Sequence, residues 1–388
     1  MELTKEQRVM NVIKRQPVDY LPSHINIADR TRYDEIARVL GLDGAEALDD
    51  FLQNHMAFPA AKEDMPIFHR DIIPLMRSIE AEGFVGVDEE GGTVYDRWGM
   101  GIQMRVGSYN VNYGFLEGLK EKNEIAKKFL PPDVDQSLMD MDFVDAVKKY
   151  KAPDPHKPTN FDPMQEELKK LKNVRFAYPD GFIGIYERAY GIVGFQNLLV
   201  EMMDHPTAVR EFFEKITDNR VESAKLKLKA GAIAGHIGDD LGTQRGAIFS
   251  LEIFRELLLP CYKRLFAVFK DAGVPMMMHS CGHIEDVLPD LINIGLDVIE
   301  PVQPCNDLRK LKREYGKDIT FYGGIDTQKL THMKPDQVRE MTRETIEILG
   351  EGGGHIIAPA QELMNDCPIE NIAAIVGTVM EMREKMAN

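Results

Sequence analysis

The feature that most constrains the fold is a regular alternation in the second half of the chain. Short apolar stretches rich in Val, Ile and Met recur there, and helix-like stretches separate them. Apolar runs without polar alternation are typical of parallel strands that are buried on both faces. We expect strands at Val174–Tyr178, Ala232–Ile237, Val274–His279, Asp297–Pro301, Ile319–Tyr322 and His355–Ala358. This order of strands and helices predicts an α/β fold with a parallel sheet.

Proline and glycine mark the boundaries of the intervening helices. Pro335 suits the first turn of one helix and Gly350 suits its end. The final helix, over Pro368–Glu384, also starts at a proline. Within the amphipathic stretch Leu251–Asp271, Pro260 predicts a kink or a break, because proline removes a helical hydrogen bond.

The first half of the chain is less regular. We expect helices at Lys5–Arg15, Arg32–Leu40 and Ala45–Asn54, a strand at Leu21–Ile27, and a β-hairpin over Thr93–Tyr109 that turns at Gly99–Gly101. With the six later strands, this predicts a (β/α)8 TIM barrel that forms a single domain over residues 1–388. An N-terminal helical and hairpin elaboration and a surface insertion at 119–172 would decorate it. An open doubly wound sheet is the alternative, which the lack of a G-x-G-x-x-G turn after any strand disfavours.

Charge and cysteine content exclude several classes of function. The 388 residues include 63 acidic and 47 basic side chains, a net charge of -16, which disfavours binding to nucleic acid or to anionic membranes. No apolar run is long enough to span a bilayer, and the charged first 16 residues lack the apolar core of a signal peptide. We therefore expect a cytoplasmic protein. Four scattered cysteines are too few for a disulfide scaffold, so we expect free thiols.

Side chains able to bind a metal, a proton or a ligand follow nearly every predicted strand. In a barrel these strand ends form the mouth where active sites lie, so the pattern favours an enzyme. The residues concerned are Tyr178, Asp180, His236, Asp239, Asp240, His279, Cys281, His283, Glu300, Tyr322, Asp326, Gln361 and Glu362.

The sequence M-M-M-H-S-C-G-H contains the sharpest local signal. His279 and Cys281 are two residues apart, so at an extended strand end both side chains point to the same side. Imidazole nitrogen and thiolate sulfur suit Zn²⁺. The alternative is a buried cysteine beside a hydrogen-bonded histidine without metal. His283, on the following turn, suits an outer position.

Three carboxylates at other strand ends have competing interpretations. Asp239 and Asp240 are adjacent, so only one can face the site, and the other suits a helix N-cap. Asp326 follows two glycines that let the backbone approach a ligand, but it could equally cap the helix that starts at Thr327. Glu300 follows an apolar strand, where it needs a metal, an arginine or a backbone donor as its partner.

Several longer motifs identify a family. They include Y-D-R-W-G at 95–99, G-I-Y-E-R-A-Y-G-I-V-G-F-Q-N-L-L at 184–199, G-D-D-L-G-T-Q-R-G at 238–246, H-S-C-G-H-I at 279–284 and F-Y-G-G-I-D-T-Q at 321–328. With these motifs the chain resembles the uroporphyrinogen decarboxylase-like superfamily, and within it the corrinoid-dependent methyltransferases. The resemblance runs over nearly the whole chain and implies a (β/α)8 barrel.

The resemblance separates two chemistries. Decarboxylases of the superfamily bind tetrapyrrole carboxylates with an M-R-Q-A-G-R segment, whereas this chain reads I-N-I-A-D-R-T-R-Y and keeps only Arg30 and Arg32. The methyltransferases bind zinc through H-x-C, which matches His279 and Cys281, and through a cysteine in a late S-P-G-C segment. Here that segment reads A-P-A-Q, so the third ligand is absent. Glu300 is the candidate replacement, and Cys305, Cys367 and Asp239 are other options.

These observations lead to one main hypothesis. Losing a thiolate makes zinc more Lewis-acidic, which suits polarisation of a methyl ether oxygen. The resemblance therefore implies a zinc enzyme that transfers a methyl group from a methoxylated aromatic compound to the Co(I) of a corrinoid (cobalamin) carried by a partner protein. Candidate residues that line the site or orient the substrate are Asp239, Tyr186 and Asp326, with Tyr322 and Gln361 binding the substrate.

Two other functions compete with this hypothesis. One is a methyl-corrinoid to thiol methyltransferase of the coenzyme M type. The other is a metal-free protein that binds a tetrapyrrole or corrinoid, or a lyase like uroporphyrinogen decarboxylase. Members of the superfamily are often dimers, and the acidic surface of this chain does not exclude a homodimer.

Overall fold

The structure is a computed structural model that describes residues 3–62, 73–105, 108–157, 160–179 and 181–387. Its centre is a set of parallel strands whose side chains are almost all buried. They are β1 (Met56–Ala57), β6 (Phe176–Ala177), β7 (Gly235–Gly238), β8 (Met276–His279), β9 (Val298–Val302), β10 (Thr320–Ile325) and β11 (His355–Pro359). Burial on both faces explains why these strands are apolar. In β8, for example, Met276, Met277 and Met278 are all buried.

Hydrogen bonds join eight parallel segments into a ring. Strands β7 to β11 form one five-stranded sheet in sequence order, and β1 pairs with β6. The extended segment at 22–27 is the eighth member: Ile357 N in β11 donates to Pro22 O, and His55 N donates to Ser23 O. Gly238 N at the end of β7 donates to Gly181 O, just beyond β6, and completes the ring. The predicted (β/α)8 barrel is confirmed.

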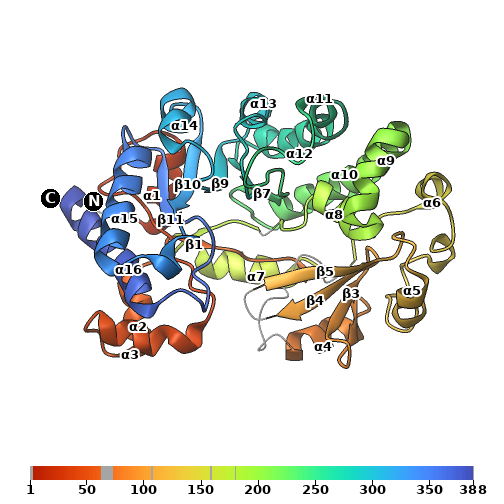
Figure 1. Cartoon of the computed structure of the whole chain (residues 1–388), viewed down its shortest axis with the longest axis horizontal. Coiled ribbons are helices and arrows are strands. Elements are labelled where there is room, and N and C mark those ends of the chain that lie inside the picture. The colour runs from red at the N-terminus through yellow and green to blue at the C-terminus, as the bar shows by residue number, and fades with distance from the viewer. Residues whose placement is uncertain (1–2, 63–72, 106–107, 158–159, 180, 388) are drawn as a thin grey trace.

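Helices follow the strands and cover the outside of the barrel (Figure 1). They are α1 (Lys5–Ile13), α2 (Tyr33–Val39), α3 (Gly44–Leu52), α8 (Tyr186–Val193), α9 (Phe195–Asp204), α10 (Pro206–Lys229), α11 (Leu251–Ile253), α12 (Leu259–Asp271), α13 (Leu288–Ile294), α14 (Leu308–Tyr315), α15 (Pro335–Gly350) and α16 (Ile369–Ala387). Short 3-10 turns lie at Arg30–Arg32 and Leu330–His332. The predicted interruption near Pro260 is confirmed, because a π-helical turn at Phe254–Leu258 separates α11 from α12.

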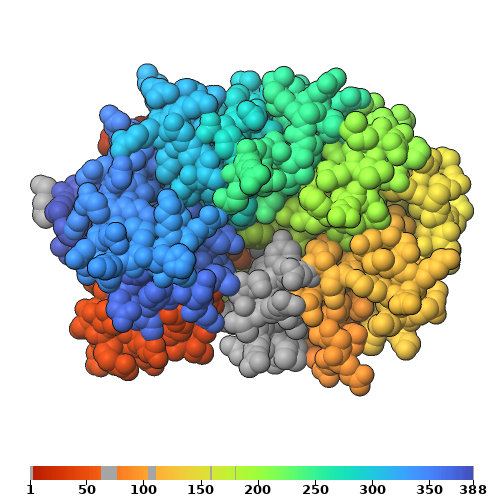
Figure 2. Space-filling model, viewed as in Figure 1, coloured from red at the N-terminus to blue at the C-terminus, as the bar shows by residue number. Residues whose placement is uncertain are grey.

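A long segment between β1 and β6 forms a layer beside the barrel. It contains α4 (Ile73–Ala81), β2 (Val85–Asp88), β3 (Thr93–Asp96), β4 (Met100–Arg105), β5 (Ser108–Gly114), α5 (Lys120–Ala126), a 3-10 turn (Gln136–Leu138), α6 (Phe143–Lys149) and α7 (Asp162–Leu171). The predicted hairpin is present as β3 and β4, but it belongs to a four-stranded antiparallel sheet in the order β2-β3-β4-β5. Figure 2 shows this layer in orange and yellow beside the green helices α8 to α10.

Buried aromatic residues join the layer to the barrel. Trp98 is 1% exposed, and the guanidinium groups of Arg188 on α8 and Arg220 on α10 lie 4.8 and 4.9 Å from the centre of its ring. Arg188 also forms a buried ion pair with Asp96. Because both arginines come from barrel helices, these contacts fix the layer against the side of the barrel. Within the described residues, no helix is both long and apolar enough to cross a bilayer.

Candidate metal centre at the barrel mouth

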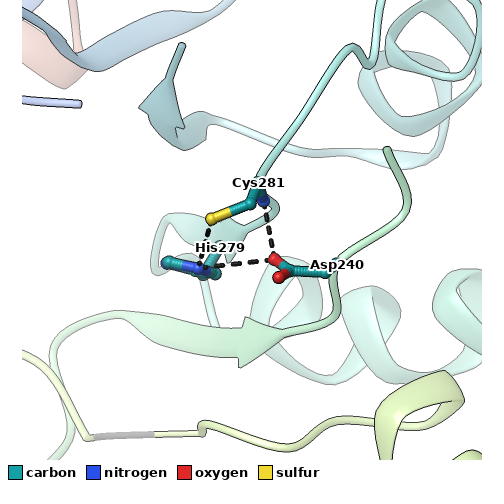
Figure 3. Close-up of side chains that lie close together, drawn as sticks. All are labelled: Asp240, His279 and Cys281. Carbon is teal, nitrogen blue, oxygen red and sulfur yellow. Dashed lines mark hydrogen bonds and ion pairs between the residues drawn. The ribbon is translucent and has the colours of Figure 1, made fainter. Parts of the chain in front are cut away.

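The register of three neighbouring strands places the candidate ligands at the same level. Gly238 in β7 is paired with His279 in β8, and His279 is paired with Glu300 in β9. Asp240 lies two residues after Gly238, as Cys281 lies two residues after His279, so both emerge from the strand ends on the same side. The sheet therefore brings Asp240, His279 and Cys281 together (Figure 3).

The ligand atoms of these three residues all lie within 4.8 Å of one another. His279 Nε2 is 3.5 Å from Cys281 Sγ and 3.5 Å from Asp240 Oδ1. The backbone N–H of Cys281 donates to Asp240 Oδ1 at 2.7 Å and fixes the carboxylate relative to the turn. One nitrogen, one sulfur and one oxygen ligand thus converge from two adjacent strand ends.

Glu300 lies on the opposite side of the His279 ring from this group. Its Oε1 is 3.4 Å from His279 Nδ1, and its Oε2 accepts a 2.8 Å hydrogen bond from the Tyr178 hydroxyl. Burial acts to raise the pKa of Glu300, but hydrogen bonding to His279 and the charge of nearby histidines hold this pKa below its usual value. Glu300 is therefore placed to orient the imidazole and favour one tautomer rather than to join the three converging ligands.

Asp239 points away from the three ligands and caps a helix. Its carboxylate accepts hydrogen bonds from the backbone N–H groups of Ile185 and Glu187 at the start of α8, and from the hydroxyl of Tyr262. Burial raises the pKa of Asp239 to about 6 despite these hydrogen bonds. Of the two adjacent aspartates, Asp239 takes the capping role and Asp240 faces the ligands.

Glu187 is a buried acid near the centre that sequence reasoning did not single out. It is 5% exposed, and its Oε1 accepts a hydrogen bond from the Tyr190 hydroxyl. Burial, followed by the charges of Asp240 and Asp239, raises the pKa of Glu187 to about 8. A carboxyl group with this pKa holds a proton at neutral pH. The one sequence signal is the pair of charged residues, Glu187 and Arg188, in the otherwise uncharged stretch G-I-Y-E-R-A-Y-G.

The other predicted site residues occupy different surroundings. Tyr186 is buried in an aromatic cluster with Tyr190 and Phe249, at ring distances of 5.3 and 5.1 Å. Tyr322 is 7% exposed, and burial followed by the charge of Glu300 raises its pKa. Gln361 is exposed on the turn after β11.

Asp326 lies at the end of β10 and serves its own turn. Its Oδ1 accepts a hydrogen bond from Gln328 N, and its Oδ2 forms a 2.7 Å ion pair with Lys329. It also borders a pocket at the barrel mouth. No helix starts at Thr327 in the structure, so Asp326 closes a turn instead of capping a helix, and it also borders the pocket.

The remaining thiols lie outside the ligand group. Cys261 and Cys367 are 2% and 4% exposed, and Cys305 is half-buried in the turn after β9. Cys305 Sγ is 3.6 Å from the side-chain amide of Asn306. In the described part of the chain, the group of potential ligands therefore contains a single sulfur.

The observed separations suit a tetrahedral zinc ion. Zinc binds nitrogen and oxygen at about 2.0 Å and sulfur at about 2.3 Å, which places tetrahedral ligand atoms roughly 3.3–3.6 Å apart. The two separations from His279 Nε2 fall in this range. Three protein ligands also leave a fourth position for substrate, as in catalytic zinc sites. The residues present therefore fit zinc.

Comparisons with known proteins agree with this architecture. The chain is 27% identical over 209 residues to the uroporphyrinogen decarboxylase of Myxococcus xanthus, which covers 50% of this chain and 55% of that protein. It is 24% identical over 170 residues to the methylcobamide:CoM methyltransferase MtaA of Methanosarcina barkeri, which covers 43% and 48%. The chain thus spans about half the length of these curated relatives.

A solved structure shows the same fold over the whole chain. The methyltransferase from Methanosarcina mazei covers 98% of this chain and 99% of its own, with a TM-score of 0.61 and 16% sequence identity. The sequence profile described as uroporphyrinogen decarboxylase (URO-D) matches residues 125–382, about two thirds of the chain. The chain therefore belongs to the uroporphyrinogen decarboxylase (URO-D) family.

Proposed function

We propose that this protein is a zinc-dependent methyltransferase that takes a methyl group from a methoxylated compound and passes it to the Co(I) corrinoid of a separate protein. The observation that carries the proposal is the convergence of Asp240, His279 and Cys281 within 4.8 Å, with both separations from His279 Nε2 in the range that suits tetrahedral zinc. The similarity to a methylcobamide:CoM methyltransferase supports methyl transfer as the reaction class.

Asp240, His279 and Cys281 would hold the metal, and Glu300 would keep His279 Nδ1 protonated so that Nε2 faces the metal. Zinc held in this way supplies Lewis acidity that draws charge from the ether oxygen of the donor. Transfer of the methyl group to Co(I) would break the carbon–oxygen bond and leave its electron pair on the oxygen. Burial of Glu187 favours its protonated form, which limits the negative charge beside the ligand group.

The ligand chemistry favours an ether donor over a thiol acceptor. A thiol substrate becomes nucleophilic on an electron-rich zinc, which a set of several thiolates provides. The ligand group here has one sulfur, and its oxygen ligand is a weaker electron donor to the metal. Transfer from methyl-corrinoid to a thiol of the coenzyme M type is the alternative that a substrate panel must test.

The positions of two arginines disfavour tetrapyrrole decarboxylation. Arg30 forms an exposed ion pair with Asp49, and Arg32 donates hydrogen bonds to the backbone carbonyls of Met364 and Cys367. Both guanidinium groups are thus occupied within the protein. A substrate with several carboxylates would have to displace these contacts to bind them.

Zinc content and methyl transfer should be measured together. Elemental analysis should find about one zinc per chain, lost in His279→Ala, Cys281→Ala and Asp240→Ala, because each change removes a ligand. His283→Ala is the matched control, since His283 lies on the next turn outside the ligand group. Methyl transfer from methoxylated arenes to cob(I)alamin should disappear with the zinc. Full activity of His279→Ala, or transfer only from methylcobalamin to thiols, would overturn the proposal.

A further inference from the structure

A pocket of about 280 Å³ opens at the barrel mouth beside the candidate metal centre. It lies among the turns that follow β7, β9, β10 and β11, and its lining includes Gln303, Cys305 and Ala360. The side chain of Gln303 lines the pocket and also contacts the turn that carries the candidate metal ligand Cys281. Its Oε1 accepts a hydrogen bond from the N–H of Gly282, the residue after Cys281, and its Nε2 donates to Ala360 O.

The volume of the pocket limits the size of its ligand. A cavity of roughly 150 Å³ holds one benzene molecule. A pocket of about 280 Å³ therefore admits a single ring with a few small substituents, and a tetrapyrrole of four rings is too large for it. This pocket suits a small donor and not a macrocycle.

The charges around the pocket limit the kind of ligand. Lys329 is the one cation among the described lining residues, and Asp326 pairs with it at 2.7 Å. On the metal-centre side of Gln303, the carboxylate of Asp240 accepts a hydrogen bond from the N–H of Cys281. A carboxylate or sulfonate would therefore find no uncompensated positive charge in the lining.

The neutral polar groups of the lining can recognise a ligand by hydrogen bonds instead of by charge. Gln244, Thr327 and Gln328 surround the rim with amide and hydroxyl groups that both donate and accept hydrogen bonds. Pro304, Ala360 and the Cys305 side chain add less polar surface. This combination is complementary to an apolar ring that carries hydroxyl groups.

We propose that this pocket binds the body of the methyl donor and selects neutral, single-ring methoxy compounds with hydroxyl substituents. The inference rests on the proposed methyltransferase function for the role of the bound molecule. The pocket's size and charge, however, can be tested without metal or turnover.

Cys305 provides a direct probe of occupancy. In the Cys281→Ser variant, Cys305 is the only remaining thiol that is not fully buried, since Cys261 and Cys367 are 2% and 4% exposed. The rate of Cys305 alkylation by iodoacetamide can then be followed by mass spectrometry. A ligand at about ten times its Kd leaves roughly one pocket in eleven free, so alkylation should slow about tenfold.

The probes are 2-methoxyphenol, the anion 4-methoxybenzoate and the thiol-free anion ethanesulfonate. We expect saturable protection by 2-methoxyphenol and little by the two anions at the same concentration. Gln328→Ala should weaken the protection, and Gln196→Ala, the same change at an exposed position on α9 outside the lining, should not.

Each contrary outcome is decisive. Equal protection by 4-methoxybenzoate or ethanesulfonate would overturn the selection of neutral donors. Failure of Cys305 to react, or absence of protection by any ring, would overturn the pocket as a donor site. Such failures with methyl transfer intact would leave the proposed function in place. Protection by 2-methoxyphenol in the Cys281→Ser variant, combined with absence of zinc and of methyl transfer in the unsubstituted protein, would instead overturn the proposed function.

Discussion

Replacing Glu300 by glutamine tests whether this residue orients the metal ligand or binds the metal itself. Glu300 Oε1 is 3.4 Å from His279 Nδ1, on the far side of the ring from Cys281 and Asp240. Glutamine keeps the shape but removes the charge that favours a proton on Nδ1. Loss of such an orienting partner typically weakens metal binding about 10- to 100-fold, or about 1.4–2.7 kcal/mol. The long 3.4 Å contact favours the lower end of this range.

The measurement is a competition titration of zinc against a chromophoric chelator. Glu300→Gln should still bind about one zinc per chain when zinc is in excess, with an affinity reduced about tenfold. Tyr178→Phe, which removes a hydrogen bond to Glu300 but leaves its charge, should have a smaller effect. Loss of zinc from Glu300→Gln as complete as from His279→Ala would show that Glu300 binds the metal directly. An unchanged affinity would show that the two side chains are not coupled.

Two further predictions concern stability. The pKa of Glu187 is raised from 4.5 to about 8 in the folded protein, so the unfolded chain loses this proton at a lower pH than the folded chain does. The stability that Glu187 contributes is therefore present at low pH and is lost as the pH rises from about 4.5 through about 8. Glu187→Gln should therefore flatten the decline of the free energy of unfolding between pH 5 and pH 8.5, measured by urea denaturation, and an unaltered pH profile would contradict the raised pKa. Trp98→Ala should reduce the free energy of unfolding by about 3–5 kcal/mol, because a fully buried indole beside Arg188 and Arg220 is removed. Trp98→Phe should cost less, and a loss below about 1 kcal/mol in the alanine variant would show that these contacts do not hold the insertion in place.

The barrel could be predicted from the sequence because its strands are buried on both faces. That burial leaves continuous apolar runs such as Met276–Met278, which are visible without knowledge of their partners. The four-stranded sheet was predicted only as one hairpin. Its outer strands β2 and β5 are short or polar, as V-G-V-D and S-Y-N-V-N-Y-G show, and they depend on pairing with β3 and β4.

Only the part of the metal centre that depends on local sequence was predicted. His279 and Cys281 are close in sequence and on one strand, so their spacing alone places them together. The choice between Asp239 and Asp240 depends on the register between β7 and β8, which no local pattern reveals. Glu187 belongs to a helix that starts beside the barrel mouth, and its proximity to Asp240 arises from tertiary packing.

The charge of the ligand group and the charge of the neighbouring pocket point to the same kind of donor. The carboxylate of Asp240 and the thiolate of Cys281 would together balance the two positive charges of a zinc ion, with His279 neutral. A centre whose charges balance would give an anionic donor little long-range attraction, and the Asp326–Lys329 pair offers no uncompensated positive charge in the pocket. Burial also favours the protonated form of Glu187, which limits the negative charge beside the ligand group. In the proposed reaction, a neutral methyl ether would therefore enter without a charge penalty, and negative charge would develop only as its carbon–oxygen bond breaks, where a bound metal would stabilise it.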